Sequence, residues 1–262
     1  MQNKLRFSLI TVPCIGVGIF FLFNVLAILF YPGYEKCTQQ EKDPITEQIV
    51  CAKSAYIISD TYSFTQNFFS ELGSINVNTD DDHYKTPNLE NNKPNTLSML
   101  FFNSSLLCVG IILITFYINF PKLFRYKEDS VKSRKFSQVC QYIGPLTGIM
   151  FAGVGAVPHD LSFGWHVFFA NWAFLTLLPL SIAHTLAFKH SNYIKSKYSL
   201  GYMIFCILLV AYVYLIFWGP QIEPDGIFTS KDLAIQVIAQ KAIVLTFIVS
   251  MIYQTVGVRK IL

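Results

Sequence analysis

Apolar residues are gathered into six blocks, each long enough to cross a bilayer as a helix. A spanning helix needs about 20 mostly apolar residues, because only a helix satisfies its own backbone hydrogen bonds in hydrocarbon. The blocks cover residues 7–31, 97–120, 139–157, 165–188, 200–218 and 237–258. The pattern predicts an all-α membrane protein with six transmembrane helices in one bundle, forming a single polytopic domain over residues 1–262.

Composition supports a membrane protein and argues against a water-soluble domain. Of the 262 residues, 53% are hydrophobic and 14% are charged, whereas charged residues make up about 25% of an ordinary soluble domain. The first apolar block is longer than the core of a secretory signal, and no small-residue cleavage site follows it. We therefore interpret it as the first span.

Basic residues indicate the orientation, because Lys and Arg beside spans stay preferentially on the cytoplasmic side. With the N-terminus inside, the inner segments carry 13 of the 20 Lys and Arg residues but only two of the 16 acids, Glu128 and Asp129. We expect both termini to be cytoplasmic. The net charge of +4 then reflects membrane topology, and no nucleic-acid partner is expected.

The connection 32–96 is the one long outer loop. Apolar positions from 54 to 75 lie near helical spacing and end at Gly73, which predicts an amphipathic helix at the membrane interface. The following stretch, 77–95, is rich in Asn, Asp, Pro and Lys. We expect it to be mobile.

Two of the six cysteines lie in this outer loop. Cys37 and Cys51 flank 13 residues on the oxidising side of the membrane, where a disulfide closing a loop of that size would contribute about 3 kcal/mol. We predict that they pair; the alternative is two free thiols in a mobile loop.

The third span carries small residues at steps of four: Gly144, Gly148, Ala152 and Ala156. Such a stripe lets two helices approach closely. It predicts close helix packing, and it also raises the possibility of a membrane-protein partner that docks on the third span.

Ionisable side chains are absent from the middles of the spans, which argues against an ion-coupled pump or a voltage sensor. Polar side chains instead collect at the predicted outer ends, where we expect one outward-facing pocket formed by Ser70, Glu71, Asn103, His159, Asp160, His166 and Lys241. His184 lies about 27 Å of helix away from His166. We expect it at the inner end, capping carbonyls or facing headgroups.

Carboxylates beside histidines could act as general acid and base, or could complete a zinc shell with a bound water. His159 and His166 are seven residues apart, not at the HxxxH step that places two ligands on one helix face. We assign no metal site and no catalytic residue. The alternative is that these groups hydrogen-bond each other and close the outer end of the bundle.

Four short motifs carry a family resemblance: Ser70 to Gly73, Phe102 with Asn103, Gly153 to Pro158, and His166. With the six-span layout, they make the chain resemble the membrane family related to the FRAG, DRAM and SFK proteins. The resemblance covers most of the chain. It implies a helical bundle whose eukaryotic relatives are linked to lipid remodelling, including that of glycosylphosphatidylinositol anchors.

Three functions follow as hypotheses. The first is lipid handling, with membrane lipids as partners and Glu71, Asn103, His166 and Lys241 lining a headgroup pocket. The second is a metal-dependent intramembrane hydrolase that uses Glu71, His159, Asp160 and His166. The third is a non-enzymatic assembly partner that docks through the third span. We favour the first.

Overall fold

A computed structural model describes residues 2–52, 54–77, 93–222 and 226–262. Six of its helical segments are long and apolar enough to cross a membrane, which confirms the predicted six-helix bundle. The helices are α1 (Gln2–Arg6) continuing into α2 (Val12–Leu29), α3 (Thr96–Tyr126), α4 (Val131–Ala156), α5 (Phe163–Lys189), α6 (Leu200–Trp218) and α7 (Ser230–Arg259). The chain is therefore a multi-pass membrane protein.

The first span is continuous but contains a π-helical segment, Phe7–Thr11, between α1 and α2. Pro13 stands in the first turn of α2. Proline lacks an N–H, and its ring clashes with the carbonyl four residues earlier. A wider π turn accommodates such a residue without ending the helix.

The third span begins earlier than its apolar pattern indicated, at Val131 instead of residue 139. The Ser130 hydroxyl accepts a hydrogen bond from the Ser133 N–H at 3.1 Å and caps the new first turns. These turns carry Lys132, Arg134 and Lys135. Apolar patterning could not find them, because they are helical but not apolar.

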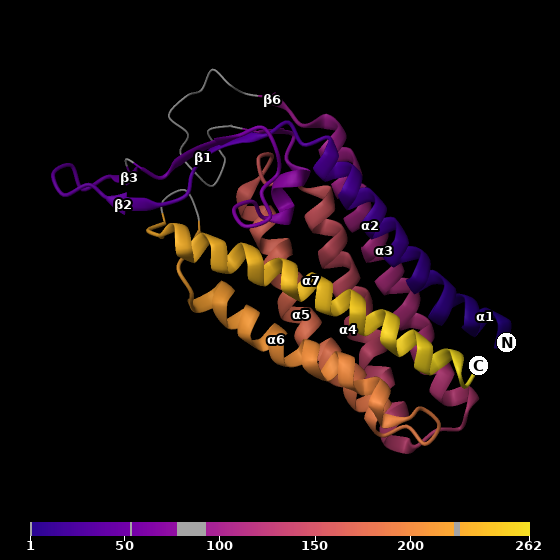
Figure 1. The fold of residues 1–262 in the computed structure, drawn as a ribbon. Coiled ribbons are helices and arrows are strands. Elements are labelled where there is room, and N and C mark those ends of the chain that lie inside the picture. Colours follow the sequence, from indigo (N-terminus) through magenta and orange to yellow (C-terminus); the bar gives the residue numbers. More distant parts are fainter. Residues whose placement is uncertain (1, 53, 78–92, 223–225) are drawn as a thin grey trace.

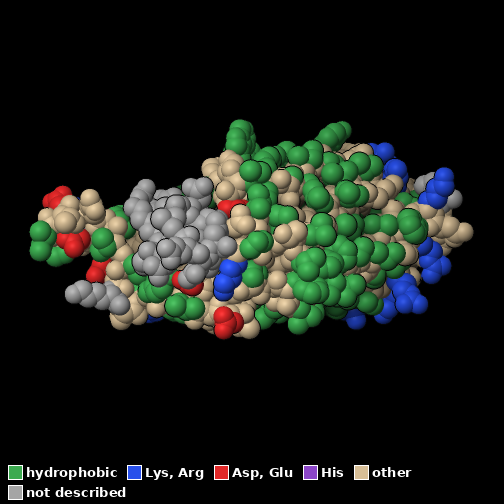
Figure 2. Space-filling model, turned by 90° about the horizontal axis from the view of Figure 1, so that it is seen from above, with side chains coloured by type: hydrophobic (Ala, Val, Ile, Leu, Met, Phe, Trp, Pro, Cys, Tyr) green, Lys and Arg blue, Asp and Glu red, His purple; other side chains and the backbone are tan. Residues whose placement is uncertain are grey.

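Both termini lie at the same end of the bundle, as an even number of spans requires (Figure 1). The Gln2 side-chain amide donates to the backbone carbonyl of Leu262. On the face seen in Figure 2, most Lys and Arg side chains gather at this end, whereas Asp and Glu side chains lie toward the other. The bundle is thus polarised in charge along its length.

The opposite end carries a cap made mainly by residues 31–77. It contains three two-stranded antiparallel sheets, in which β1 (Tyr34–Cys37) pairs with β4 (Tyr56–Ser59), β2 (Gln40–Lys42) with β3 (Ile49–Cys51), and β5 (Asn76–Val77) with β6 (Lys93–Pro94). A short 3-10 helix, η2 (Phe69–Gly73), lies against α3. The β2–β3 hairpin projects away from the bundle (Figure 1).

The prediction of an amphipathic helix over 54–75 was wrong, since only η2 is helical there. Ile57 and Ile58 belong to β4, where β1 provides a pairing partner. Further along, the Asn67 Oδ1 accepts from the Ser63 N–H at 3.0 Å. Side-chain to backbone bonds of this kind offer the chain an alternative to helix. Tertiary pairing and local capping therefore override the helical spacing.

Most of the stretch 77–95 that we expected to be mobile, residues 78–92, lies outside the described residues. Its two ends are ordered by the pairing of β5 with β6, in which Asn76 is opposite Pro94 and Val77 opposite Lys93.

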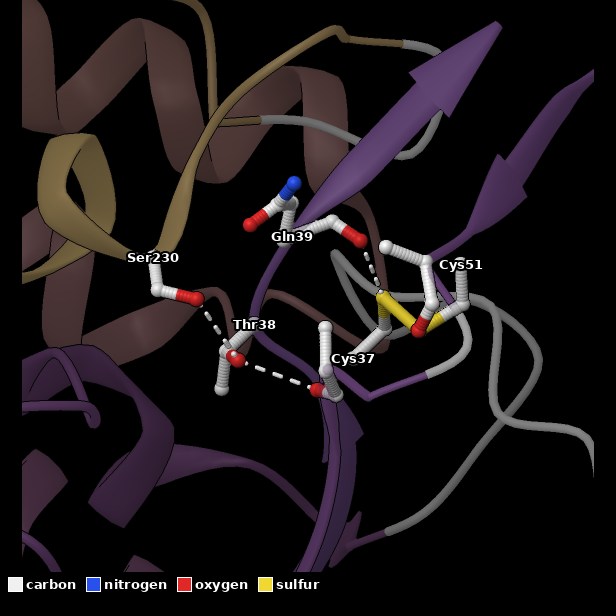
Figure 3. Close-up of a disulfide and its surroundings, with 7 residues drawn as sticks. Cys37, Thr38, Gln39, Cys51 and Ser230 are labelled. Atoms are coloured by element: carbon white, nitrogen blue, oxygen red, sulfur yellow. Dashed lines mark hydrogen bonds between the residues drawn. A yellow bond between two sulfur atoms is a disulfide. The ribbon is translucent and has the colours of Figure 1, made fainter. Parts of the chain in front are cut away.

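The predicted disulfide is present. Cys37 and Cys51 are bonded, with their Cα atoms 5.7 Å apart, and the bond joins β1 to β3 (Figure 3). Beside it, the Thr38 and Ser230 hydroxyls lie 3.2 Å apart, and Gln40 forms two backbone hydrogen bonds with Phe228. The cross-linked hairpin is therefore attached to the start of α7.

The stripe of small residues on α4 faces α3 of the same chain. A Cβ on Gly144 would lie 2.3 Å from the Cβ of Tyr117, and one on Gly148 would lie 2.6 Å from the carbonyl oxygen of Gly110. At the end nearest the cap, Gly155 takes over the contact with α3, while Ala156 is exposed. The predicted close packing is real, but α3 occupies most of the stripe that suggested a partner.

Candidate functional site

A buried ion pair lies at the centre of the cap. Lys36 of β1 places its Nζ 3.1 Å from both carboxylate oxygens of Glu71 in η2, and the two residues are 2% and 7% exposed. Burying two charges costs several kcal/mol each unless further hydrogen bonds satisfy them. Here the Phe68 N–H donates to Glu71 Oε1 at 2.7 Å, and the Asn67 amide donates to Oε2. Both oxygens of the Glu71 carboxylate therefore accept hydrogen bonds from residues of the cap.

Lys241 reaches this cluster from α7. Its Nζ donates to the backbone carbonyl of Asn67 and lies 5.3 Å from the ring centre of Tyr62 and 5.2 Å from that of Phe69. Within the described residues Lys241 forms no ion pair, so carbonyl and ring faces stabilise its charge. Burial and the charge of Glu71 hold the pKa of Tyr62 well above its usual value, so this phenol is neutral.

Asn103 and Asp160, which we expected in the pocket, bind backbone. The Asp160 carboxylate accepts hydrogen bonds from the N–H groups of Ile75 and Asn76, at 2.9 Å each. Asn103 of α3 donates to the Gly73 carbonyl at 3.1 Å. A Cβ on Gly73 would lie 2.3 Å from the Asn103 Oδ1, so only glycine fits there. Both side chains tie the segment after η2 to the bundle.

The predicted polar pocket therefore divides. Glu71 and Lys241 belong to the charged cluster of the cap, and Asn103 and Asp160 hold backbone. His159 is buried, with its ring centre 5.8 Å from that of His166. Two of the predicted residues, Ser70 and His166, line an apolar cavity inside the bundle.

That cavity has a volume of about 150 Å³ and lies inside the bundle, between α2, α3, α4, α5 and α7. Its walls are apolar and include Phe20, Phe102, Leu106, Ala170 and Phe247. None of the residues that line it is Asp, Glu, Lys or Arg. An apolar cavity of this size stays dry and accepts apolar ligands.

The cavity is elongated along the helix axes. Its lining residues run from His166 to Leu177 on α5 and from Gln240 to Met251 on α7, so the first and last are eleven residue steps apart on each helix. At 1.5 Å per residue this is about 16 Å, close to the roughly 15 Å depth of one leaflet in a 30 Å hydrocarbon core. The cavity matches a hydrocarbon chain of one leaflet in length.

Three uncharged polar residues line the cavity, and all three belong to its end nearest the cap: Ser70, His166 and Gln240. The Gln240 Oε1 accepts from the Phe69 N–H at 2.9 Å, which ties η2 to α7 across this end. The His166 Nδ1 lies 2.7 Å from the carbonyl oxygen of Val157. A carbonyl can only accept, so Nδ1 carries the proton, and in the neutral ring Nε2 has a lone pair.

Reasoning from the sequence missed Lys36, Asn67 and Gln240. The first two lie in the outer loop, where their roles depend on strand pairing and on a turn that no local pattern indicated. Gln240 precedes Lys241 in the sequence, and no motif marked it. Adjacent residues of an α-helix point about 100° apart around its axis. Gln240 therefore reaches the cavity, whereas Lys241 reaches the cap.

His184 was expected at the inner end, capping carbonyls or facing headgroups. It does lie near the C-terminal end of α5, five positions before Lys189, but the role predicted for it there was wrong. It is 1% exposed, with its ring stacked on that of Tyr202 at 4.0 Å between centres. Its Nε2 lies 2.8 Å from Gln254 Oε1, and its Nδ1 lies 3.2 Å from the Tyr117 hydroxyl. Aromatic side chains of three helices, α3, α5 and α6, surround its ring, which hydropathy along one helix could not indicate.

Within the part of the chain that the structure describes, no three His, Cys, Asp or Glu side chains lie together as a set of metal ligands. The carboxylates named for the hydrolase hypothesis are engaged elsewhere, Glu71 with Lys36 and Asp160 with backbone amides. The geometry therefore favours the cavity over a metal centre as the candidate site.

Comparison of the chain with protein-family models, with curated proteins and with solved structures gives no match in any of the three. The resemblance to the FRAG/DRAM/SFK family remains a prediction from short motifs. The function must be argued from the geometry of the site.

Proposed function

We propose that this protein binds a membrane lipid, with one hydrocarbon chain in the cavity and the polar end of the lipid at Ser70, His166 and Gln240. The observation that carries the proposal is the cavity itself: apolar along its length, about as long as one leaflet is deep, and polar at the end near the cap. A lipid molecule has the same sequence of apolar and polar parts.

Packing supplies a reason for the cavity to be occupied. An enclosed empty cavity costs about 24 cal/mol per Å³ in lost contacts. This cavity is partly open, so its 150 Å³ corresponds to at most about 4 kcal/mol. A hydrocarbon chain entering from lipid gains little from the hydrophobic effect, because lipid is equally apolar. The gain comes from van der Waals contact with the walls.

We also propose that the cap faces the outside and both termini face the cytoplasm, which places the polar end of the cavity in the outer leaflet. The gathering of basic side chains at the end with the termini supports this orientation (Figure 2), as does a disulfide in the cap. A membrane-impermeant maleimide applied to intact cells should label Ile45→Cys, at an exposed position of the hairpin, but not Glu128→Cys. The reverse labelling would overturn the orientation.

A steric block tests lipid binding. Ala170 lines the cavity, so Ala170→Phe should fill it and lower the amount of lipid that copurifies, measured by native mass spectrometry after mild delipidation. Ala211→Phe is the matched control, because Ala211 is exposed on α6 and does not line the cavity. Equal lipid retention by the two variants and the unaltered protein would contradict the proposal.

A further inference from the structure

Two polar groups at the end of the cavity have unused hydrogen-bonding capacity. The Nε2 of His166 is an acceptor, because Nδ1 donates to Val157, and within the described residues Nε2 has no hydrogen-bond partner. The Ser70 hydroxyl likewise has none there. His166 is 5% exposed, so bulk water does not readily satisfy its ring. Because both side chains line the cavity, a ligand in the cavity can complete these hydrogen bonds.

From this geometry we infer that the ligand is an uncharged lipid whose polar end is a hydroxyl group, which donates to His166 Nε2 and exchanges a hydrogen bond with Ser70. The inference rests on the proposed function and narrows it to a chemical class. Sterols and diacylglycerols share this chemistry, since each is an uncharged lipid whose one hydrogen-bond donor is a free hydroxyl.

Charged headgroups fit the site less well. A phosphate oxygen would face the lone pair of His166 Nε2, and no cation lines the cavity. The two nearby lysines of the cap are engaged, Lys36 by Glu71 and Lys241 by Asn67 and its aromatic neighbours. A quaternary ammonium group carries no hydrogen to donate. A charged headgroup buried in this cavity would have no counter-charge, and burying an unpaired charge is costly.

Matched probes test the donor directly. Tritiated cholesterol and tritiated dioleoylglycerol are each bound to the purified full-length protein in detergent micelles, then displaced by the same unlabelled lipid or by its O-methyl ether. The ether keeps the apolar body and the oxygen, and replaces the donated hydrogen by a methyl group. For at least one of the two lipids we expect the hydroxyl form to displace about tenfold better, the effect of one hydrogen bond to a buried acceptor. The labelled lipid that binds shows whether a sterol or a diacylglycerol supplies the hydroxyl group.

Variants assign the preference to a residue. His166→Phe should reduce the discrimination between hydroxyl and ether to about twofold or less, whereas His166→Gln, which keeps an acceptor, should retain part of it. Ser70→Ala provides a second test that leaves the Val157 bond intact and should weaken the preference. Size-exclusion profiles show whether each variant is folded before it is compared.

The failure of this inference is distinguishable from the failure of the proposed function. If lipids bind, Ala170→Phe blocks them, and the hydroxyl and ether forms displace equally, the hydroxyl preference is overturned while lipid binding stands. If neither labelled lipid binds but phospholipid copurifies in an Ala170-dependent way, the chemical class is again overturned. If no lipid binds and Ala170→Phe changes nothing, both proposals are overturned.

Discussion

Lys241 of α7 donates a hydrogen bond to the backbone carbonyl of Asn67, a residue 174 positions earlier in the chain. The Asn67 side chain in turn donates to Glu71, which binds Lys36. One network therefore joins the last span to the cap through three segments. Because η2 also contributes Ser70 to the cavity, the network positions the polar end of the proposed lipid site.

Glu71→Gln should destabilise the protein by about 3 kcal/mol, because it leaves the buried Lys36 ammonium without its counter-charge. Urea titration of the protein in mild detergent measures the free energy of unfolding. Glu47→Gln is the control, since its ion pair with Lys42 is largely exposed and should contribute less than about 1 kcal/mol.

A double substitution separates charge from packing. Lys36→Met combined with Glu71→Leu removes both charges and should recover most of the stability that Glu71→Gln loses. A double variant as unstable as Glu71→Gln would mean that the hydrogen bonds to Asn67 and Phe68, and not the unpaired charge, determine the effect.

Removing the disulfide should lower the stability of the cap. Cys37 and Cys51 are 14 positions apart, and a loop of that size corresponds to about 3 kcal/mol in the chain-entropy treatment. Cys37→Ser should lower the melting temperature in detergent. A reductant should lower the melting temperature of the unaltered protein, but it should not change that of Cys37→Ser, which has no disulfide to reduce. Cys14→Ser, at an exposed free cysteine of α2, should leave the melting temperature unchanged.

Gly148→Ala should destabilise the bundle although alanine favours helix. The new methyl group would lie 2.6 Å from the Gly110 carbonyl oxygen, so α3 and α4 must separate, at a cost of about 1–3 kcal/mol. Gly18→Ala is the matched control, because nothing lies within 4 Å of a Cβ there. That variant should be neutral or slightly stabilising. Equal melting temperatures for the two variants would argue against close α3–α4 packing.

Asp160→Ala should loosen the segment that follows η2 without unfolding the bundle. Its carboxylate accepts from two backbone amides, and hydrogen bonds to a charged group contribute about 1.5–3 kcal/mol each. Hydrogen exchange followed by mass spectrometry should show faster exchange in peptides containing Ile75 and Asn76, with α4 and α5 unchanged. Slowed or unaltered exchange there would refute the assignment.

The six spans, the disulfide and the close packing of the third span could be predicted from the sequence. Each depends on a property carried by residues near one another in the chain. Apolar length is dictated by bilayer thickness, the Cys37–Cys51 pair closes a short loop, and the step of four from Gly144 to Gly148 is a local helical repeat. The helix predicted over 54–75 is absent for the complementary reason. Its residues 56–59 pair instead with β1, where Cys37 is opposite Tyr56 and Tyr34 is opposite Ser59, and no local pattern indicates such a pairing.

The site was decided by the tertiary structure. The sequence alone indicated that Glu71, His166 and Lys241 share the outer end, because depth in the membrane follows from position along a helix. It could not indicate that Lys241 turns to the cap while Gln240 turns to the cavity, nor that Lys36 neutralises Glu71. Helix rotation and contacts between distant segments are determined by packing, and no local pattern of residues encodes them.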